Sequence, residues 1–550
     1  MKLTIEKDGW GILDAPPTPA ILRVIRQLEG RRFNLKAGGT KIEATKSNIE
    51  LLSGAFPLEI SEPSVAGRRS TARRGVYNPR TEPMPHQLEA SNKLRSVKHA
   101  ALFMEQGTGK TLVAIDRAGE LWMAGKISAV LVVAPKGVHR QWIADQLPLH
   151  SGIPFRGAYW PLKEGEWNSA LALGDTMAVF TINIDAARTP KGKAMCLDYI
   201  AEHHGQVLMI VDESHSIKNS ASQRWKAVDA LGKLCDFRAI LTGTPIARSL
   251  LDAWSQYKWL DEEILGYRYA SAFKNEYCIM GGFQGKVIIG HRNVERFRER
   301  VERFTYRVSK EEIGITPARS SGWEFDMTTE QRRVIRGLKR DLFAAIDSGE
   351  VATAANAAVA VMKMQQVSNG FYMDDNGQPV RIMEPAANPR IQALIELISS
   401  RSGKGIIWAR FREDITAICE ALSGAGLKAA AYHGGTPDKE RVRTVERFLQ
   451  PQEATDSVDF FVANPGAGGT GLNLQGACDY DVFYSNSDNS IERWQAEARI
   501  HRIGTCGIVT HFDLVAPFSP DRLILRRHAA KKSISEMALD DVRRILEEEM

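Results

Sequence analysis

Short apolar runs alternate with segments of helical periodicity in two long parts of the chain. In the first part, residues 71–250, the runs cover residues 99–103, 129–134, 179–182, 207–211 and 239–241. In the second part, residues 388–520, they cover residues 405–409, 429–432 and 458–463. Continuous apolar strands separated by helices are typical of parallel sheets that are covered on both faces. The pattern therefore predicts an α/β fold with two doubly wound parallel sheets.

The remaining parts of the chain follow other patterns. Aromatic and charged residues at helical spacing predict a helical insertion at residues 251–387, and residues 521–550 predict a charged brace helix. Residues 1–70 predict a small α+β domain. Its expected elements are helices at residues 19–28 and 48–52 and strands at residues 30–33 and 40–45.

Length and composition limit the possible classes. A chain of 550 residues is too long for one hydrophobic core, so several domains are expected. The net charge of +6 is small, so any affinity for nucleic acid must come from a local surface. The six cysteines form no C-x-x-C pair, which argues against a zinc site and a disulfide framework. With no apolar run of membrane length and no signal peptide, we expect a soluble, cytoplasmic protein.

The first candidate for chemistry is a glycine-rich turn between a predicted strand and a predicted helix. It reads Met104-Glu-Gln-Gly107-Thr108-Gly109-Lys110-Thr111. Such a turn can direct backbone N–H groups at phosphate oxygens, at the positive end of the following helix. Lys110 can then reach the β- and γ-phosphates of a nucleotide, and the Thr111 hydroxyl can ligate Mg²⁺.

A second candidate lies 102 positions after Lys110, where a predicted strand ends in Asp212-Glu213-Ser214-His215. The carboxyl ends of parallel strands meet at the edge where ligands bind. Asp212 can hold Mg²⁺ through water, and Glu213 can polarise the water that attacks the γ-phosphate. Gln87, about twenty residues before the loop, can pair with the N6 and N7 edge of adenine, which favours ATP.

The second lobe contributes basic and glycine-rich segments. Asn464 to Leu474 carries so many glycines that a close approach of its backbone to another molecule is the natural explanation. Further on, Gln495, Arg499 and Arg502 have the spacing of one helical face. Two arginines on such a face can stabilise charge on the γ-phosphate of an ATP held by the other lobe.

These motifs keep their order along the chain and together resemble one family. E-Q-G-T-G-K-T, V-V-A-P-K-G-V-H-R-Q-W, V-D-E-S-H-S-I-K-N and L-T-G-T-P-I are similar to the first motor lobe of superfamily-two helicases, and more narrowly to Swi/Snf-related DNA translocases. The segment from Gln495 to Thr505 resembles the last motif of that family. The resemblance covers roughly residues 77–520 and implies two RecA-like lobes with ATP and Mg²⁺ between them.

The resemblance also implies roles that spacing alone does not assign. It adds Thr108, Gly471 and Gln495 to the expected ATP-binding residues. It places sequence-independent contacts with the DNA backbone at Lys136, His139, Thr181, Thr242, Arg410, His433, Gly434, Thr470 and Asn473. Residues 1–70 resemble, loosely, the HARP-type substrate-recognition module of annealing helicases.

The favoured hypothesis is an ATP-dependent translocase on duplex or branched DNA, acting in fork remodelling, annealing, repair or recombination. We expect a monomer in a bacterial or phage-infected cell, associated with the nucleoid, with single-strand-binding or recombination proteins as further partners. The alternatives that remain open are a strand-separating helicase, a translocase that strips proteins from DNA, the motor subunit of a restriction-type complex, and a DNA-binding scaffold with an inactive motor, which intact Lys110, Asp212, Glu213, Arg499 and Arg502 oppose. The segment from Gly281 to Val287 is a candidate wedge for the first of these.

Overall fold

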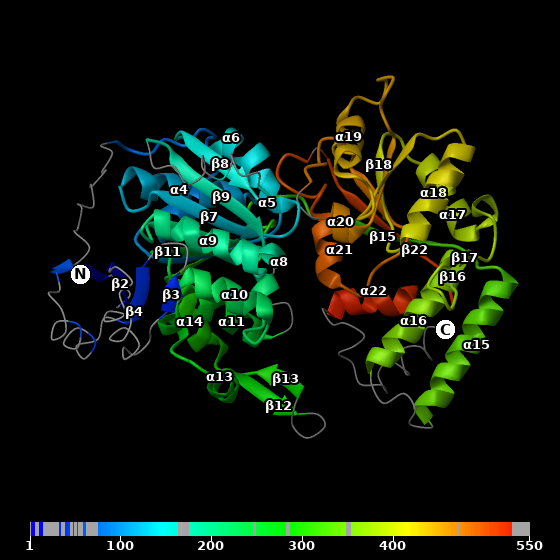
Figure 1. Ribbon diagram of the computed structural model, residues 1–550. Coiled ribbons are helices and arrows are strands. Elements are labelled where there is room, and N and C mark those ends of the chain that lie inside the picture. Colours follow the sequence, from blue (N-terminus) through cyan, green and yellow to red (C-terminus); the bar gives the residue numbers. More distant parts are fainter. Residues whose placement is uncertain are drawn as a thin grey trace. The chain divides into compact units, whose positions relative to one another are not determined.

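The computed structural model describes residues 2–5, 10–14, 32–34, 39–43, 48, 52, 59–61, 75–162, 167, 175–243, 245, 249–281, 287–347, 354–469, 472–505 and 507–530. The chain divides into two compact units, Met1–Arg74 and Gly75–Met550 (Figure 1). Within the described residues, no helix is both long enough and apolar enough to cross a membrane.

The first unit contains a five-stranded sheet with the order β3-β4-β2-β1-β5. Its strands are β1 (Lys2–Ile5), β2 (Trp10–Asp14), β3 (Arg32–Asn34), β4 (Gly39–Glu43) and β5 (Glu59–Ser61). The two strands predicted from the sequence are β3 and β4, which pair antiparallel. The other three strands were not predicted. The helix predicted at residues 19–28 lies outside the described residues.

The second unit begins with a seven-stranded sheet in which all neighbouring strands are parallel. Its order is β14-β6-β11-β10-β7-β9-β8, the crossover pattern of a doubly wound sheet. The strands are β6 (His99–Met104), β7 (Ala129–Ala134), β8 (Phe155–Tyr159), β9 (Met177–Asn183), β10 (Val207–Asp212), β11 (Phe237–Leu241) and β14 (Thr305–Val308).

Helices cover both faces of this sheet (Figure 1). Along β6 and β7 alternate residues enter different cores: Phe103 and Leu131 belong to one cluster, Leu102 and Val132 to the other. This alternation explains why the strands read as continuous apolar runs. The helices are α3 (Pro85–Leu94), α4 (Lys110–Met123), α5 (Val138–Gln141), α6 (Leu147–His150), α8 (Ile184–Ala187), α9 (Pro190–Glu202) and α10 (Gln223–Gly232).

The region predicted as a helical insertion contains more than helices. Its helices are α11 (Leu250–Leu260), α12 (Glu262–Leu265), α13 (Ala270–Tyr277), α14 (Val294–Glu302), α15 (Thr329–Asp347) and α16 (Ala354–Asn369). The prediction of helix was wrong for Thr305–Val308, which forms β14 at the edge of the first sheet. Because Thr305, Tyr306 and Val308 are buried by this pairing, tertiary packing decides their conformation.

The same region also supplies a strand to the second sheet and two separate hairpins. β15 (Arg319–Glu324) pairs with β22. The hairpins are β12 (Cys278–Gly281) with β13 (Val287–His291), and β16 (Phe371–Met373) with β17 (Pro379–Arg381). Of the candidate wedge segment, Gly281 ends β12 and Val287 begins β13, and residues 282–286 lie outside the described residues.

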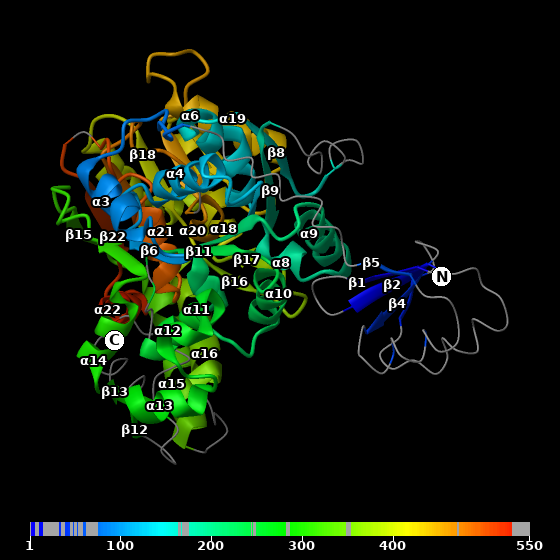
Figure 2. The same ribbon diagram turned by 90° about the vertical axis from the view of Figure 1, so that its left-hand side faces the viewer.

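The second sheet has six strands in the order β15-β22-β21-β18-β20-β19, and all its pairs are parallel. Besides β15 its strands are β18 (Gly405–Trp408), β19 (Ala429–Tyr432), β20 (Phe460–Ala463), β21 (Tyr480–Phe483) and β22 (Thr510–Val515). The helices are α17 (Pro389–Ser399), α18 (Arg412–Gly424), α19 (Asp438–Leu449), α20 (Pro465–Gly468), α21 (Ser490–Glu497) and α22 (Asp521–Ala530). The predicted α/β fold with two parallel sheets is confirmed (Figure 2).

Candidate functional site

The glycine-rich loop joins β6 to α4, as the sequence predicts. Gly107 and Gly109 have φ angles of 85° and 89°, in the region that favours glycine. Helix α4 begins at Lys110, so the loop leads directly into the helix N-terminus. Lys110 Nζ donates hydrogen bonds to Met104 O (2.9 Å) and Glu105 O (3.2 Å). Burial lowers the pKa of Lys110, although the carboxylates of Glu213 and Asp212 oppose that shift.

Gln87 and His86 of α3 contact the same loop. Both lie near the carbonyl oxygen of Thr108, at 3.3 Å from Gln87 Nε2 and 2.8 Å from His86 Nε2. A Cβ at Gly109 would lie only 2.1 Å from Gln87 Nε2. Glycine is therefore required at residue 109 by both its φ angle and this close approach.

Asp212 is the last residue of β10 and Glu213 follows it, and this end of the strand lies beside the loop. Asp212 Oδ2 accepts a hydrogen bond from Trp142 Nε1 (3.0 Å), and its Oδ1 accepts one from the Glu213 N–H (2.9 Å). Burial and the Glu213 carboxylate raise the pKa of Asp212. Burial alone would also raise the pKa of Glu213, but His215 and Lys110 hold it below its usual value.

His215 connects this carboxylate pair to the next segment of the first lobe. Its Nδ1 lies 3.2 Å from Glu213 Oε2 and 3.4 Å from Thr242 Oγ1. Ser214 donates its hydroxyl to Gln256 Oε1 of α11 (2.6 Å) and so ties the carboxylate segment to α11.

The prediction that Gln495, Arg499 and Arg502 share one helix was wrong, because α21 ends at Glu497. The N–H groups of Arg499 and Ile500 bond three residues back, to Ala496 O and Glu497 O. Arg499 Nε donates a hydrogen bond to Gln495 O (2.9 Å). If the α-helix continued, the backbone N–H of Arg499 would bond to that carbonyl oxygen instead. The two arginines therefore lie on a tight turn.

That turn contacts the glycine-rich loop. The Ile503 N–H donates to Gly107 O (3.2 Å), and a Cβ at Gly107 would lie 2.3 Å from Arg502 Cβ. Arg499 Nη1 donates to Leu472 O (2.9 Å), and Arg502 Nη1 to Asn473 Oδ1 (2.5 Å). Burial and the charge of Arg502 lower the pKa of Arg499 to about 9. The structure thus brings together Lys110, Glu213 and both arginines.

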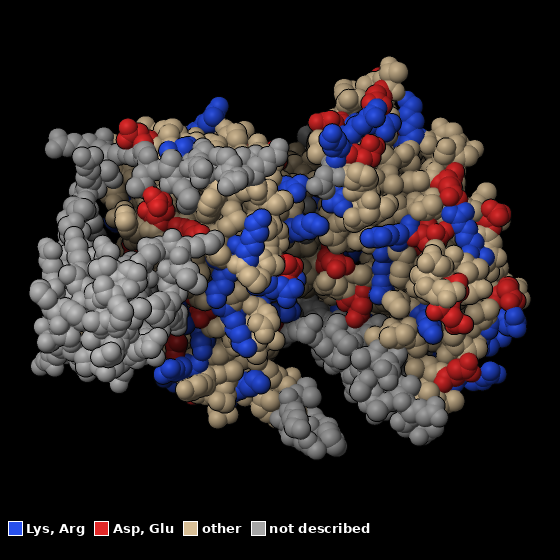
Figure 3. All heavy atoms as spheres, viewed as in Figure 1, with Lys and Arg blue, Asp and Glu red and all other residues tan. Residues whose placement is uncertain are grey.

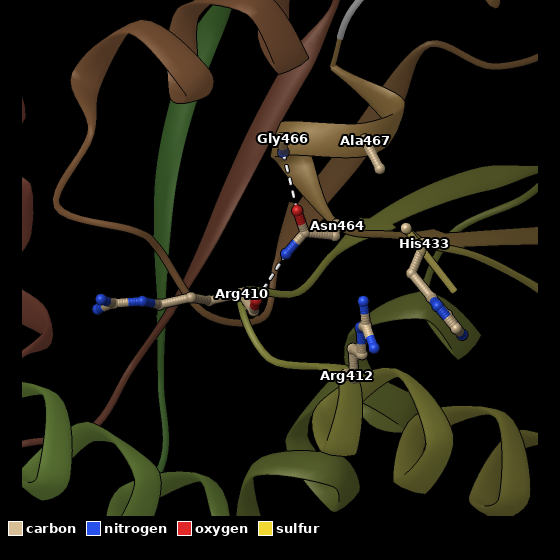
Figure 4. Close-up of a pocket in the computed structure, with 7 residues that line it drawn as sticks. Arg410, Arg412, His433, Asn464, Gly466 and Ala467 are labelled. Carbon is tan, nitrogen blue, oxygen red and sulfur yellow. Dashed lines mark hydrogen bonds between the residues drawn. The ribbon is translucent and has the colours of Figure 1, made fainter. Parts of the chain in front are cut away.

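A second site lies in the other lobe, in a pocket of about 340 Å³. It is lined by Arg410, Arg412, His433, Gly434, Asn464, Gly466 and Ala467, and none of these is acidic (Figure 4). Asn464 connects two segments that line the pocket. Its Nδ2 donates to Arg410 O (2.5 Å), and its Oδ1 accepts a hydrogen bond from the Gly466 N–H (3.0 Å). Burial and the charges of Arg412 and Arg441 lower the pKa of His433. The pocket therefore has the electrostatics of an anion site.

Comparison with known families identifies this arrangement. A family model described as "SNF2-related domain" matches residues 86–373, slightly more than half of the chain. The chain belongs to the SNF2-related family. A second model, "Helicase conserved C-terminal domain", matches residues 389–504.

Individual relatives share this SNF2-related region. The chain is 24% identical over 457 residues to "Probable chromatin-remodeling complex ATPase chain" of Oryza sativa subsp. japonica, covering 80% of this chain and 39% of the relative. It is 23% identical over 483 residues to "ISWI chromatin-remodeling complex ATPase ISW1" of Saccharomyces cerevisiae, covering 84% and 41%. The chain thus spans about two fifths of these relatives' length.

A solved structure, "Sulfolobus solfataricus SWI2/SNF2 ATPase core in complex with dsDNA", is also similar. It shares 20% sequence identity and aligns with a TM-score of 0.38. The alignment covers 86% of this chain and 97% of the solved one.

The residues that the sequence assigns to DNA in this SNF2-related chain differ in exposure. Lys136, Gly434 and Asn473 are exposed, and Arg410 and His433 are partly buried beside the pocket. His139, Thr181 and Thr242 are at most 2% exposed. Two of these side chains form hydrogen bonds within the protein: Thr181 Oγ1 donates to His139 O (2.6 Å), and His139 Nε2 lies 2.9 Å from Trp160 O. Thr470 and Gly471 lie outside the described residues.

The predicted Mg²⁺ ligands are a buried carboxylate, Asp212, and the half-buried Thr111. Among the described residues no group of three or more histidine, cysteine, aspartate or glutamate side chains could hold a metal ion. A site with one carboxylate and one hydroxyl fits Mg²⁺, which keeps several waters and takes its other ligands from phosphate oxygens.

Several residues at these sites were given no role from the sequence. Trp142 contacts Asp212, Gln365 contacts Arg410 (2.8 Å), and Arg412 lines the pocket. Lys310 Nζ lies 3.3 Å from His501 Nδ1, and so joins the segment after β14 to the arginine turn. Trp142 ends the motif V-V-A-P-K-G-V-H-R-Q-W and Arg412 follows Arg410 by two residues, so both carried a signal in the sequence, but all these contacts depend on the fold.

Proposed function

We propose that this chain hydrolyses ATP and uses the energy to move along DNA, with duplex or branched DNA as its substrate. The observation that carries the proposal is the contact between the predicted phosphate loop and the arginine turn, at Gly107 and Ile503. A nucleotide on the loop would lie against both lobes. Its binding and hydrolysis would therefore change how the lobes meet.

In the first lobe, Lys110 is the residue that binds the β- and γ-phosphates. Its ammonium group already points at the loop, where two carbonyl oxygens are its acceptors, and phosphate oxygens would replace them. Thr111 and Asp212, the latter through water, would hold Mg²⁺, which supplies neutralisation of charge on the phosphate oxygens. Gln87 would contact the adenine, and Thr108 and the two glycines the phosphates.

Glu213 is the group that accepts a proton in hydrolysis. A water bound to its carboxylate would attack the γ-phosphorus, pass its proton to Glu213, and break the bond to the β–γ bridging oxygen, releasing ADP and phosphate. His215 holds the pKa of Glu213 low, so the carboxylate is ready to act as a base. Thr242 in turn orients His215.

Arg499 and Arg502 would stabilise the charge that develops on the γ-phosphate. Arg499 is 8% exposed and has no carboxylate among its hydrogen-bond acceptors, which are Gln495 O and Leu472 O. An anionic phosphate would relieve both the burial of this charge and its repulsion by Arg502. Arginine fingers contribute on the order of 10³–10⁵ in rate in related reactions.

DNA would be held through its phosphates. The pocket around Arg410, Arg412 and His433 has three basic groups and no acidic one, and Lys136 is exposed on the first lobe. Figure 3 shows further Lys and Arg side chains gathered over α8, α9 and α10; exposed members are Arg188, Lys191, Lys193, Arg224 and Lys226. Such contacts ignore base sequence and weaken steeply as salt rises.

Fork remodelling or annealing remains the favoured role, with residues 1–74 as the part that recognises branched DNA.

One observation supports the strand-separating alternative: the hairpin β12–β13 exposes Ile279 (44%), Met280 (36%) and Ile289 (64%), which could stack against a parted base pair. Two of the relatives are named as chromatin-remodelling ATPases, and this favours the alternative in which the protein displaces others from DNA.

The test is DNA-stimulated ATP turnover of K110A and E213Q. Both variants should lose about 10²-fold or more of the stimulated rate, because the first loses phosphate binding and the second the base. Single-stranded, duplex and forked DNA are compared, with strand annealing and strand separation scored on the same substrates.

K233A is the matched control, since Lys233 is exposed directly after α10 and pairs with Asp229 (2.7 Å). It should turn over ATP at the wild-type rate. Undiminished turnover by folded E213Q would contradict the catalytic assignment, and absence of stimulation by any DNA would contradict the translocase.

A further inference from the structure

Trp142 fixes the orientation of Asp212. Its indole N–H donates to Asp212 Oδ2 over 3.0 Å, and the two side chains are 2% and 7% exposed. The other oxygen of the carboxylate accepts the Glu213 N–H. Because each oxygen has its own buried donor, the carboxylate cannot rotate without losing a hydrogen bond, and its free lone pairs keep one direction.

Trp142 is also the first residue of a π-helical turn, Trp142–Gln146. Such turns are rare and occur often at functional sites. The turn follows α5, which follows the exposed Lys136 and Gly137 (φ 95°). Buried hydrogen bonds from Thr181 and His139 hold α5 in place. A displacement at Lys136 would therefore reach Trp142 through a short and rigid segment.

We propose that Trp142 is a positioning residue that couples DNA contact at Lys136 to Mg²⁺–nucleotide binding at Asp212. The inference rests on the proposed function and names the side chain through which its two binding events communicate. Coupling of this kind is reciprocal: if DNA strengthens nucleotide binding, nucleotide strengthens DNA binding by the same factor.

A buried tryptophan that bonds a carboxylate does not by itself imply such a role. Trp408 Nε1 donates to Asp481 Oδ2 over the same 3.0 Å, inside the second lobe. Asp481 also accepts from the His511 ring, and neither residue lines the pocket. What distinguishes Trp142 is that its acceptor lies beside Lys110 and Glu213, and that its own helix begins at the exposed turn.

The experiment measures binding of a fluorescent ATP analogue to the full chain, with Mg²⁺ or with EDTA, and with or without a duplex oligonucleotide. W142F keeps an aromatic ring but removes the N–H donor. We expect unchanged affinity in EDTA, a gain from Mg²⁺ reduced about tenfold, and a reduced gain from DNA. W259F is the matched control in the same lobe, since Trp259 is fully buried and donates to Val228 O (3.1 Å).

W259F should retain both gains. Retention of both gains by W142F would overturn the inference while leaving the proposed function intact. Failure of the wild-type chain to bind the analogue in Mg²⁺ would overturn both. A second measurement keeps Trp142 in place: its indole ¹⁵N–¹H resonance, assigned by its loss in W142F or W142H, should shift with the Mg²⁺–nucleotide and not with nucleotide in EDTA. An identical shift in both conditions would contradict the coupling.

Discussion

A single carboxyl group holds the start of the second unit on α4. Tyr77 Oη donates to Asp116 Oδ1 (2.8 Å), and a Cβ at Gly119 would lie 2.1 Å from the Tyr77 ring. Burial raises the pKa of Asp116 to about 6, with the nearby Glu120 carboxylate adding to the shift. Tyr77 lowers that pKa by donating to the ionised form, but does not cancel the cost of burial.

This pKa gives the first lobe a predictable pH dependence. Between the usual aspartate pKa and about 6, the folded state binds the proton that the unfolded state has lost. The free energy of unfolding therefore falls as pH rises through this range, and the loss is complete above it. D116N cannot ionise, so its Tm should match wild type at pH 4 and exceed it by a few °C at pH 7.5.

Thermal unfolding followed by circular dichroism across this pH range measures the difference. Y77F is the companion variant: it leaves ionised Asp116 without its donor, so it should lose more Tm at pH 7.5 than at pH 5. A Tm advantage of D116N that does not change with pH would contradict the assignment of the pKa to Asp116.

At the scale of single residues, the sequence reveals groups whose chemistry is needed, and not the groups that orient them. Lys110 and Asp212 stand out because phosphate and Mg²⁺ binding demand those residue types after a strand. Trp142 ends the motif V-V-A-P-K-G-V-H-R-Q-W, but that motif does not show that its indole N–H bonds to Asp212. Its bond to Asp212 depends on how the turn that follows α5 packs in the folded lobe, which no local pattern encodes.

Helix α16 holds Arg410 in position from outside the second sheet. Gln365 Oε1 accepts from Arg410 Nη1 (2.8 Å), while its Nε2 donates to Asn486 O (2.9 Å). Gln365 is fully buried, so its removal leaves the guanidinium without this acceptor. Q365A should weaken binding to duplex DNA about threefold to tenfold, because Arg410 is no longer fixed.

Fluorescence anisotropy with a labelled duplex at several salt concentrations measures this loss. Q331A is the matched control: Gln331 is buried and donates to Val367 O and Ser368 O of α16, but does not contact Arg410. It should lower Tm and leave DNA affinity unchanged. Equal losses of DNA affinity in Q365A and Q331A would mean that α16 acts only through stability.

At the scale of elements, some strands with two buried faces could be predicted, but the equally buried β21 and β22 and the end of α21 were missed. β7 and β10 are continuous apolar runs, and both were located correctly. The end of α21 at Glu497 escaped prediction, because the periodicity of Gln495, Arg499 and Arg502 continues past it. There the Arg499 side chain and the Arg499 backbone N–H compete for Gln495 O. Such competition cannot be predicted from the residue type alone.

At the scale of the whole molecule, the connection between the two sheets lies at the candidate nucleotide site. β14 ends the first sheet at Val308 and β15 begins at Arg319. The residues between them contact both lobes: Lys310 N–H donates to Glu105 Oε2 (2.7 Å), and Thr316 O lies 2.9 Å from His501 Nε2. Any rotation of one lobe against the other must therefore change contacts of the glycine-rich loop and the arginine turn together.

The first unit is the part of the molecule to which we assign preference for branched DNA. It has its own five-stranded sheet and separates from the rest after Arg74. Deletion of residues 1–74 retains Tyr77 and its contact with α4, so we expect the second unit to keep its fold and its candidate sites. The deletion should lower ATPase stimulation by forked DNA severalfold and stimulation by plain duplex much less.

Steady-state ATPase assays with forked and duplex DNA of equal length measure that ratio, with Y77A as the intermediate case. In Y77A the first unit is still present, but the anchor that fixes where the chain leaves it is lost. The forked-to-duplex ratio of Y77A should therefore fall between those of wild type and the deletion. Equal losses on both substrates in the deletion would remove the recognition role from residues 1–74, and an unchanged ratio in Y77A would mean that the anchor at α4 does not transmit it.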